Sequence, residues 1–116
     1  MLKRIRATYI ENNKPQSDHL VLIAPIDSDG AIADGEIYGF VVDNESRYPF
    51  VGIPDGKEFV LDYGAFGRDE DAEEKEIARL NLVGKRLHVG DLFTRVNKFI
   101  GELQEDTYTY RVESIV

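Results

Sequence analysis

The segment 26–36 places carboxylates at the spacing of a calcium-binding loop. Its sequence, IDSDGAIADGE, puts Asp27 and Asp29 at the third and fifth ligand positions and Glu36 at the twelfth. Pro25 then occupies the first ligand position, where it offers no side-chain oxygen, and the flanking residues favour strands although the motif requires two helices. A weak calcium-binding module is therefore only an alternative. The Asp-Gly steps are better explained as turns in a long connection between strands.

The same segment belongs to a strongly acidic stretch. Residues 15–46 contain seven acidic residues and no lysine or arginine, in a chain whose net charge is -8. Their mutual repulsion would be relieved by a basic protein partner, and the field would also steer association. We therefore expect a non-catalytic binding or regulatory domain of the inhibitor or immunity type, which engages its partner through the acidic surface around residues 27–45. The expected contact residues are Asp27, Asp29, Asp34, Glu36, Asp43 and Glu45.

Basic and aromatic residues alternate in the C-terminal part of the chain. This mixture can stack bases and neutralise phosphates on a sheet surface, and it can equally line a small-ligand site. An alternative function is therefore a small nucleic-acid- or ligand-binding barrel. Nearby acidic residues almost cancel the basic charge, so nucleic acid is the disfavoured partner. The residues expected to bind in this alternative are Arg86, His88, Arg95 and Tyr108.

Catalysis has no comparable support in the sequence. The chain has two histidines and no cysteine, and no serine lies in a nucleophile-elbow pattern. Its 22 acidic residues offer many carboxylate pairs, but nothing in the spacing singles one out for acid-base work. No residue pattern indicates a cofactor or a metal site. A binding role is therefore favoured over an enzyme.

Length and composition bound the organisation of the chain. A chain of 116 residues is expected to form a single globular domain over residues 1–116. The N-terminal residues lack the apolar core of a signal peptide, and no apolar run approaches the roughly 18–20 residues of a membrane span. With no cysteine for disulfides, the expected location is cytoplasmic, without membrane association.

Most segments alternate between apolar and polar residues with a period of two, which predicts strands. The expected strands are 3–10, 20–24, 37–42, 58–63, 86–89, 92–100 and 107–116. The expected fold is α+β and mostly β, as a small curled antiparallel sheet or a partly open β-barrel of about six to seven strands. One short helix is expected over about 69–80.

The helix and the C-terminal strand carry two further expectations. Asp69 or Asp71 can cap the helix, and Ile77 and Leu80 contribute to a modest apolar stripe that would dock on the sheet. The strand 107–116 ends the chain. If it lies at an edge of the sheet, its backbone could pair with a second copy and form a homodimer.

Overall fold

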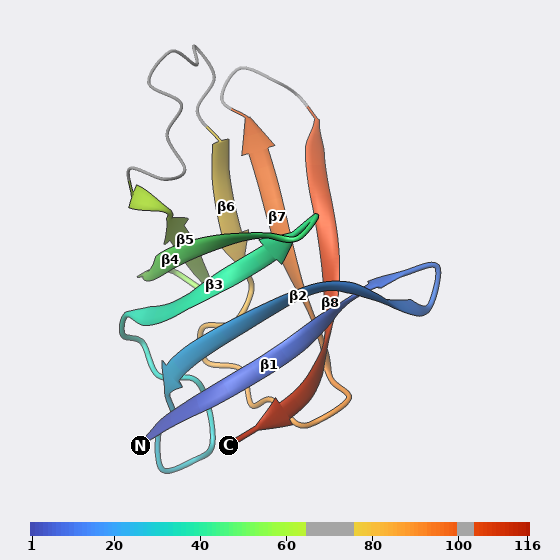
Figure 1. Ribbon diagram of the computed structural model, residues 1–116. Coiled ribbons are helices and arrows are strands. Elements are labelled where there is room, and N and C mark those ends of the chain that lie inside the picture. Colours follow the sequence, from blue (N-terminus) through green and yellow to red (C-terminus); the bar gives the residue numbers. More distant parts are fainter. Residues whose placement is uncertain (65–75, 100–103) are drawn as a thin grey trace.

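The computed structural model describes residues 1–64, 76–99 and 104–116, and within these ranges the chain forms eight β-strands (Figure 1). No α-helix occurs in these ranges, so none of the described segments is a helix that could cross a membrane. The strands are β1 (Leu2–Glu11), β2 (Lys14–Pro25), β3 (Ile37–Asp43), β4 (Ser46–Asp55), β5 (Glu58–Asp62), β6 (Glu76–Leu80), β7 (Leu92–Phe99) and β8 (Glu105–Ile115).

The sheet closes on itself. Each described strand pairs antiparallel with the next one along the chain, and β8 returns to pair with β1. The mostly β, antiparallel character of the expected fold is confirmed, but the expected six to seven strands and the partial opening are wrong. The condition set for a homodimer, a C-terminal strand at a sheet edge, is not met, because β8 pairs with β7 over residues 105–111 and with β1 over residues 109–115.

Residues 76–80, expected as the end of a helix, instead form β6. This strand pairs with β5 on one side and β7 on the other, and Ala78 and Leu80 point into the interior with no exposed surface. Alanine, leucine and glutamate favour helices locally, but pairing on both sides and burial of alternate residues override that preference. Residues 69–75 of the expected helix lie outside the described residues.

Two tight turns set the register of the hairpins β1–β2 and β3–β4. Asn12 and Asn13 have φ angles of 52° and 62°, and Asn44 and Glu45 have φ angles of 49° and 70°. Two consecutive residues with positive φ are typical of the type I′ turn, whose twist matches that of the paired strands. These two turns lie at the same end of the barrel, which we call the turn end.

The opposite end, which we call the loop end, is closed by the connections 26–36 and 81–91. The Asp27 carboxylate accepts hydrogen bonds from the backbone N–H groups of Asp29, at 2.9 Å, and Ala31, at 3.0 Å. Ile32 then exchanges backbone hydrogen bonds of 2.9 Å with Lys85 and Gly84. The side chains of Ile32 and Leu82 are 1% and 0% exposed, so these loops seal this end with apolar side chains.

The interior beneath the turn end is packed with apolar side chains from all eight described strands. Phe93 and Tyr110 stack with their ring centroids 5.6 Å apart, and they are 1% and 0% exposed. A fully packed interior is one of the two common outcomes for a barrel of eight strands. The buried residues are Ile5, Ala7, Leu20, Leu22, Ala24, Ile32, Ile37, Val41, Phe50, Phe59, Leu61, Ala78, Leu80, Leu82, Phe93, Tyr110 and Val112.

Strands β2 and β3 approach each other unusually closely at Gly39. A Cβ atom at this position would lie 2.0 Å from the carbonyl oxygen of Val21 and 2.8 Å from the Cα atom of Leu22. Both neighbours are backbone atoms, which cannot rotate away. Glycine is therefore required here by the close approach of the two strands.

Candidate functional site

Arg95 points into the barrel although it carries a full charge. Only 2% of its surface is exposed, and its neighbours two residues away on β7, Phe93 and Asn97, are 1% and 6% exposed. Successive side chains of a strand point to opposite faces, so these three residues share the inner face of β7. Arg95 is the largest fully buried side chain among the described residues.

The guanidinium of Arg95 is held by four side chains. Its Nε donates to the hydroxyl of Tyr110 at 3.1 Å, and its Nη1 donates to the Oδ1 of Asn97 at 3.4 Å. Its Nη2 contacts both carboxylate oxygens of Asp43, at 3.2 Å and 3.1 Å. The Cζ of Arg95 also lies 4.3 Å from the ring centroid of Tyr108, its direct partner on β8.

The ion pair between Arg95 and Asp43 spans the interior of the barrel. In the closed order of the eight described strands, β3 and β7 are four places apart in either direction. Asp43 is the last residue of β3 and immediately precedes the Asn44-Glu45 turn, so the pair lies at the turn end. It therefore joins opposite walls of the barrel above the stacked rings of Phe93 and Tyr110.

The two members of this pair differ in their access to solvent. The side chain of Arg95 is 2% exposed, whereas that of Asp43 is 32% exposed. Both carboxylate oxygens also approach the same nitrogen, Nη2, and not the two nitrogens of a parallel fork. Asp43 is thus the accessible partner of a guanidinium that water does not reach.

Tyrosine rings surround the guanidinium at the turn end. Tyr9 of β1 lies 5.7 Å from Tyr108 and 6.1 Å from Tyr110 between ring centroids. A second aromatic group comes from β4 and the residue after β5, where Tyr63 lies 6.3 Å from Phe50. These rings provide flat apolar surfaces whose hydroxyl groups can bind polar atoms.

The electrostatics of the site keep Arg95 charged. Burial acts to lower the pKa of Arg95, but Tyr110, Tyr63 and Asp43 more than offset it, so this pKa lies above its ordinary value. Burial raises the pKa of the Tyr110 phenol, and Arg95 opposes this shift without cancelling it. At neutral pH the site therefore presents a cation and a neutral phenol to anything that reaches it.

The structure brings together only part of the basic and aromatic set expected from the sequence. Arg95 and Tyr108 are in contact inside the barrel, while Arg86 and His88 lie on the connection 81–91 at the loop end. Arg86 forms an isolated bridge with Ala31, not the strand expected over 86–89, and His88 is exposed beside Asp91.

The acidic set is also divided between the two ends. Asp27, Asp29, Asp34 and Glu36 lie on the loop 26–36 at the loop end, while Asp43 and Glu45 lie at the turn end. The seven residues of β3 separate the two groups by roughly 20 Å. Asp43 serves the buried ion pair and Asp27 holds its own loop together, so these two carboxylates have structural partners.

Sequence reasoning missed Tyr9, Asn97 and Tyr110 as members of the site. A signal existed in the alternation of β7, where Phe93 shares a face with Arg95 and Asn97. The opposite face of the same strand carries Leu92 and Val96, so alternation alone did not decide which face was inside. The partnership with Asp43 could not be inferred, because it depends on closure of the sheet.

No protein-family model, curated protein or solved structure matches this chain. The function must therefore be argued from the geometry of the site. Within the described residues, no three histidine or acidic side chains gather closely enough to hold a metal ion. The loop 26–36 lies wholly within these residues, so the calcium alternative finds no ligand cluster there.

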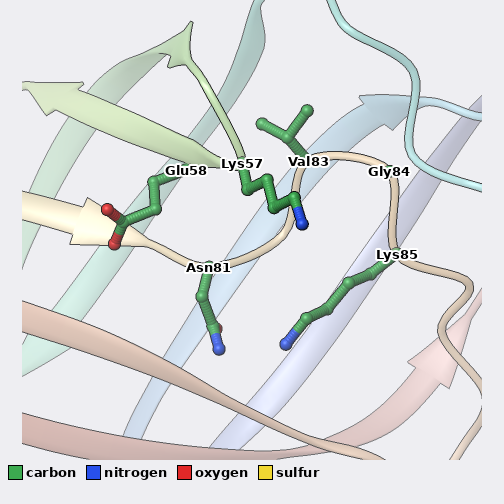
Figure 2. A pocket seen from close by; sticks show the side chains of 6 residues that line it. All are labelled: Lys57, Glu58, Asn81, Val83, Gly84 and Lys85. Carbon is green, nitrogen blue, oxygen red and sulfur yellow. The ribbon is translucent and has the colours of Figure 1, made fainter.

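A concavity lies on the surface near the loop end. It has a volume of about 600 Å³ and is bordered by the β4–β5 turn and the start of the connection 81–91. Figure 2 shows the ammonium groups of Lys57 and Lys85 and the side-chain nitrogen of Asn81 around it, with the carboxylate of Glu58 farther away. Both lysines are exposed, so their charges are screened by water and salt. This pocket is a weaker candidate than the buried guanidinium.

Proposed function

We propose that this protein is a non-catalytic binding barrel that takes a small ligand at its turn end, with Arg95 as the principal recognition residue. One observation carries the proposal: a guanidinium that is 2% exposed lies in the barrel interior, and its only described carboxylate partner is 32% exposed. Because the interior below Phe93 and Tyr110 is filled, the ligand would enter from the turn end, where Asp43 is the solvent-accessible member of the pair.

The energetics of the ion pair support a role beyond stability. Withdrawing each ion from water costs several kcal/mol, and replacing a buried ion pair with well-packed apolar residues is often neutral or stabilising by about 1–4 kcal/mol. The lower interior of this barrel is filled with apolar side chains, so the barrel is packed there without a buried ion. Buried groups with perturbed pKa values are also enriched at functional sites.

We expect small aromatic compounds to bind wild-type protein and to shift the NMR signal of the Arg95 Nε–H. That N–H is buried and hydrogen-bonded, so its signal should be resolved from those of exposed arginines. The probes are benzoate, benzyl alcohol and benzylamine, which have similar size and different charge. Arg95→Met should weaken the bound compound roughly tenfold or more, because a charge-assisted hydrogen bond contributes about 1.5–3 kcal/mol.

Arg111→Met is the matched control, since Arg111 lies on β8 next to Tyr110 but is exposed. This variant should bind the compound as wild type does. The proposal fails if no probe at millimolar concentration moves the Arg95 signal, or if the affinity survives in Arg95→Met.

A second candidate function is association with a basic protein through the loop end. Asp29 and Asp34 are exposed, and neither forms a salt bridge with any lysine or arginine of the described residues. A basic partner should therefore bind at low salt and be released at roughly 1 M salt, where the Debye length is about 3 Å. Pull-downs with wild type and with Asp29→Asn/Asp34→Asn test this, with Glu45→Gln at the turn end as control. Equal capture by all three proteins would contradict it.

A further inference from the structure

Three side chains besides Asp43 contact the Arg95 guanidinium. Tyr110 holds Nε, Asn97 accepts from Nη1, and the ring of Tyr108 lies against the guanidinium. These three contacts come from β7 and β8, on one wall of the barrel. If the Asp43 side chain turned away, the Nη2 group would remain aimed at the same point of the interior.

Asp43 lies at the edge of the site, where its side chain reaches solvent. It is the last residue of β3, it borders the two-residue turn at Asn44, and nearly a third of its side chain is already in contact with solvent. A rotation of its side chain toward the turn would therefore restore the hydration of its carboxylate without breaking a strand pairing. Because both of its oxygens approach Nη2 alone, a freely positioned carboxylate could align better with the guanidinium.

We propose that the ligand of the turn end is a small monocarboxylate whose carboxylate takes the place of Asp43 on Arg95. This inference rests on the proposed function and names the ligand class. The exchange keeps one negative charge beside the buried guanidinium, so no uncompensated charge is created inside the barrel. A neutral ligand that displaced Asp43 would leave Arg95 unpaired, and a cationic ligand would be repelled by it.

The surroundings of Tyr9 favour a single negative charge on the ligand. Burial, and after it the carboxylates of Glu11, Asp18 and Asp43, raise the pKa of Tyr9, so several acidic groups lie near this end of the barrel. A dianion such as inorganic phosphate would meet their repulsion with only one described buried cation to offset it. The rings of Tyr9 and Tyr108 suit a planar substituent beside the carboxylate.

The test compares benzoate binding by wild type and by Asp43→Ala in a buffer free of carboxylates. In wild type, benzoate can bind only those molecules in which Asp43 has turned away from Arg95, so the apparent affinity for benzoate falls in proportion to that fraction. Removing Asp43 should therefore tighten benzoate binding by roughly tenfold or more. The readouts are calorimetric titration and the Arg95 Nε–H signal. Inorganic phosphate and benzyl alcohol should each bind Asp43→Ala more weakly than benzoate.

Asp34→Ala is the matched control, because it removes one negative charge at the opposite end of the barrel and should leave benzoate affinity unchanged. Asp43→Asn provides a second variant. Its side-chain oxygen can still accept a hydrogen bond from Nη2 but carries no charge, so its increase in benzoate affinity should be smaller than that of Asp43→Ala. If Asp43→Ala fails to fold, Asp43→Asn replaces it in the test, and this variant should bind benzoate more tightly than wild type does.

The inference is overturned if benzoate binds the Asp43 variants no more tightly than it binds wild type. It is also overturned if Asp43→Ala/Arg95→Met keeps the increased affinity for benzoate. Phosphate binding at least as tight as that of benzoate would also overturn it. Failure of the proposed function looks different. If wild type binds benzyl alcohol through Arg95 with no preference for benzoate, the monocarboxylate class is wrong but the proposed function stands. If wild type binds no probe while Asp43→Ala binds benzoate, the proposed function is wrong, and the inference fails with it although the exchange at Arg95 is possible in the variant.

Discussion

Asp43→Ala is expected to lower the free energy of unfolding by about 3 kcal/mol, the lower end of the range for breaking a buried ion pair by removal of one partner. The loss arises chiefly because Arg95, 2% exposed, would keep its charge without a counterion. The lower end of the range applies because Asp43 itself is partly solvated and because water can reach the vacated position. Urea unfolding monitored by circular dichroism, in buffer without carboxylates, measures the change.

The double variant Asp43→Ala/Arg95→Met separates this cause from a simple loss of packing. Methionine fills much of the volume of arginine without a charge, but it leaves the buried Tyr110 hydroxyl and the Asn97 amide without the Arg95 donor. The double variant should therefore recover part of the loss and be clearly more stable than Asp43→Ala. Asp34→Ala, on the surface of the loop end, should change the stability by less than about 0.5 kcal/mol. An Asp43→Ala variant as stable as wild type would show that the ion pair contributes nothing to the fold.

Gly39→Ala is expected to destabilise the protein by about 3 kcal/mol or more, or to prevent folding altogether. The added methyl group would lie 2.0 Å from the Val21 carbonyl oxygen, and only a shift of β2 against β3 could relieve that overlap. Overpacking against mobile side chains typically costs about 1–3 kcal/mol, and a collision with the backbone belongs at or above the top of that range.

Gly35→Ala is the matched control for this substitution. The nearest atom to a Cβ at Gly35 is the Cγ of Pro25, at 3.7 Å, which is ordinary van der Waals contact. The same glycine-to-alanine change should therefore alter the midpoint of urea unfolding only slightly at Gly35 and strongly at Gly39. Equal effects at the two positions would mean that β2 and β3 can separate at Gly39 without cost.

Period-two alternation predicted most of the barrel, and it failed where prolines or helix-forming residues interrupted it. No strand was expected over β4, which contains Pro49 and Pro54, residues that are uncommon in a strand paired on both sides. The two neighbours of β4 cover different parts of it: β4 pairs with β3 through residues 46–52 and with β5 through residues 51–55. Each proline thus lies where β4 has a neighbouring strand on one side only, so its missing N–H need not interrupt a ladder.

The candidate site was predictable only in part, for a related reason. Arg95 and Tyr108 were selected because basic and aromatic residues alternate near the C-terminus, and they are direct partners across β7 and β8. The carboxylate opposite them comes from a residue 52 positions earlier in the chain. The alternation within a strand shows which residues share a face of that strand. Which residue lies opposite, across the barrel, depends on how many strands close the ring.

The β1–β8 pairing has a consequence for synthesis of the chain. It joins Ile5 to Ile115, and the backbone groups of Arg4 and Val116 bond to each other in both directions. Adjacent hairpins can assemble as the ribosome releases them, but the ring cannot be completed before β8 emerges. Until then the outer side of β1 lacks its partner, and its free backbone groups are open to pairing with other nascent chains. Protection of that strand should thus depend on how soon β8 is synthesised.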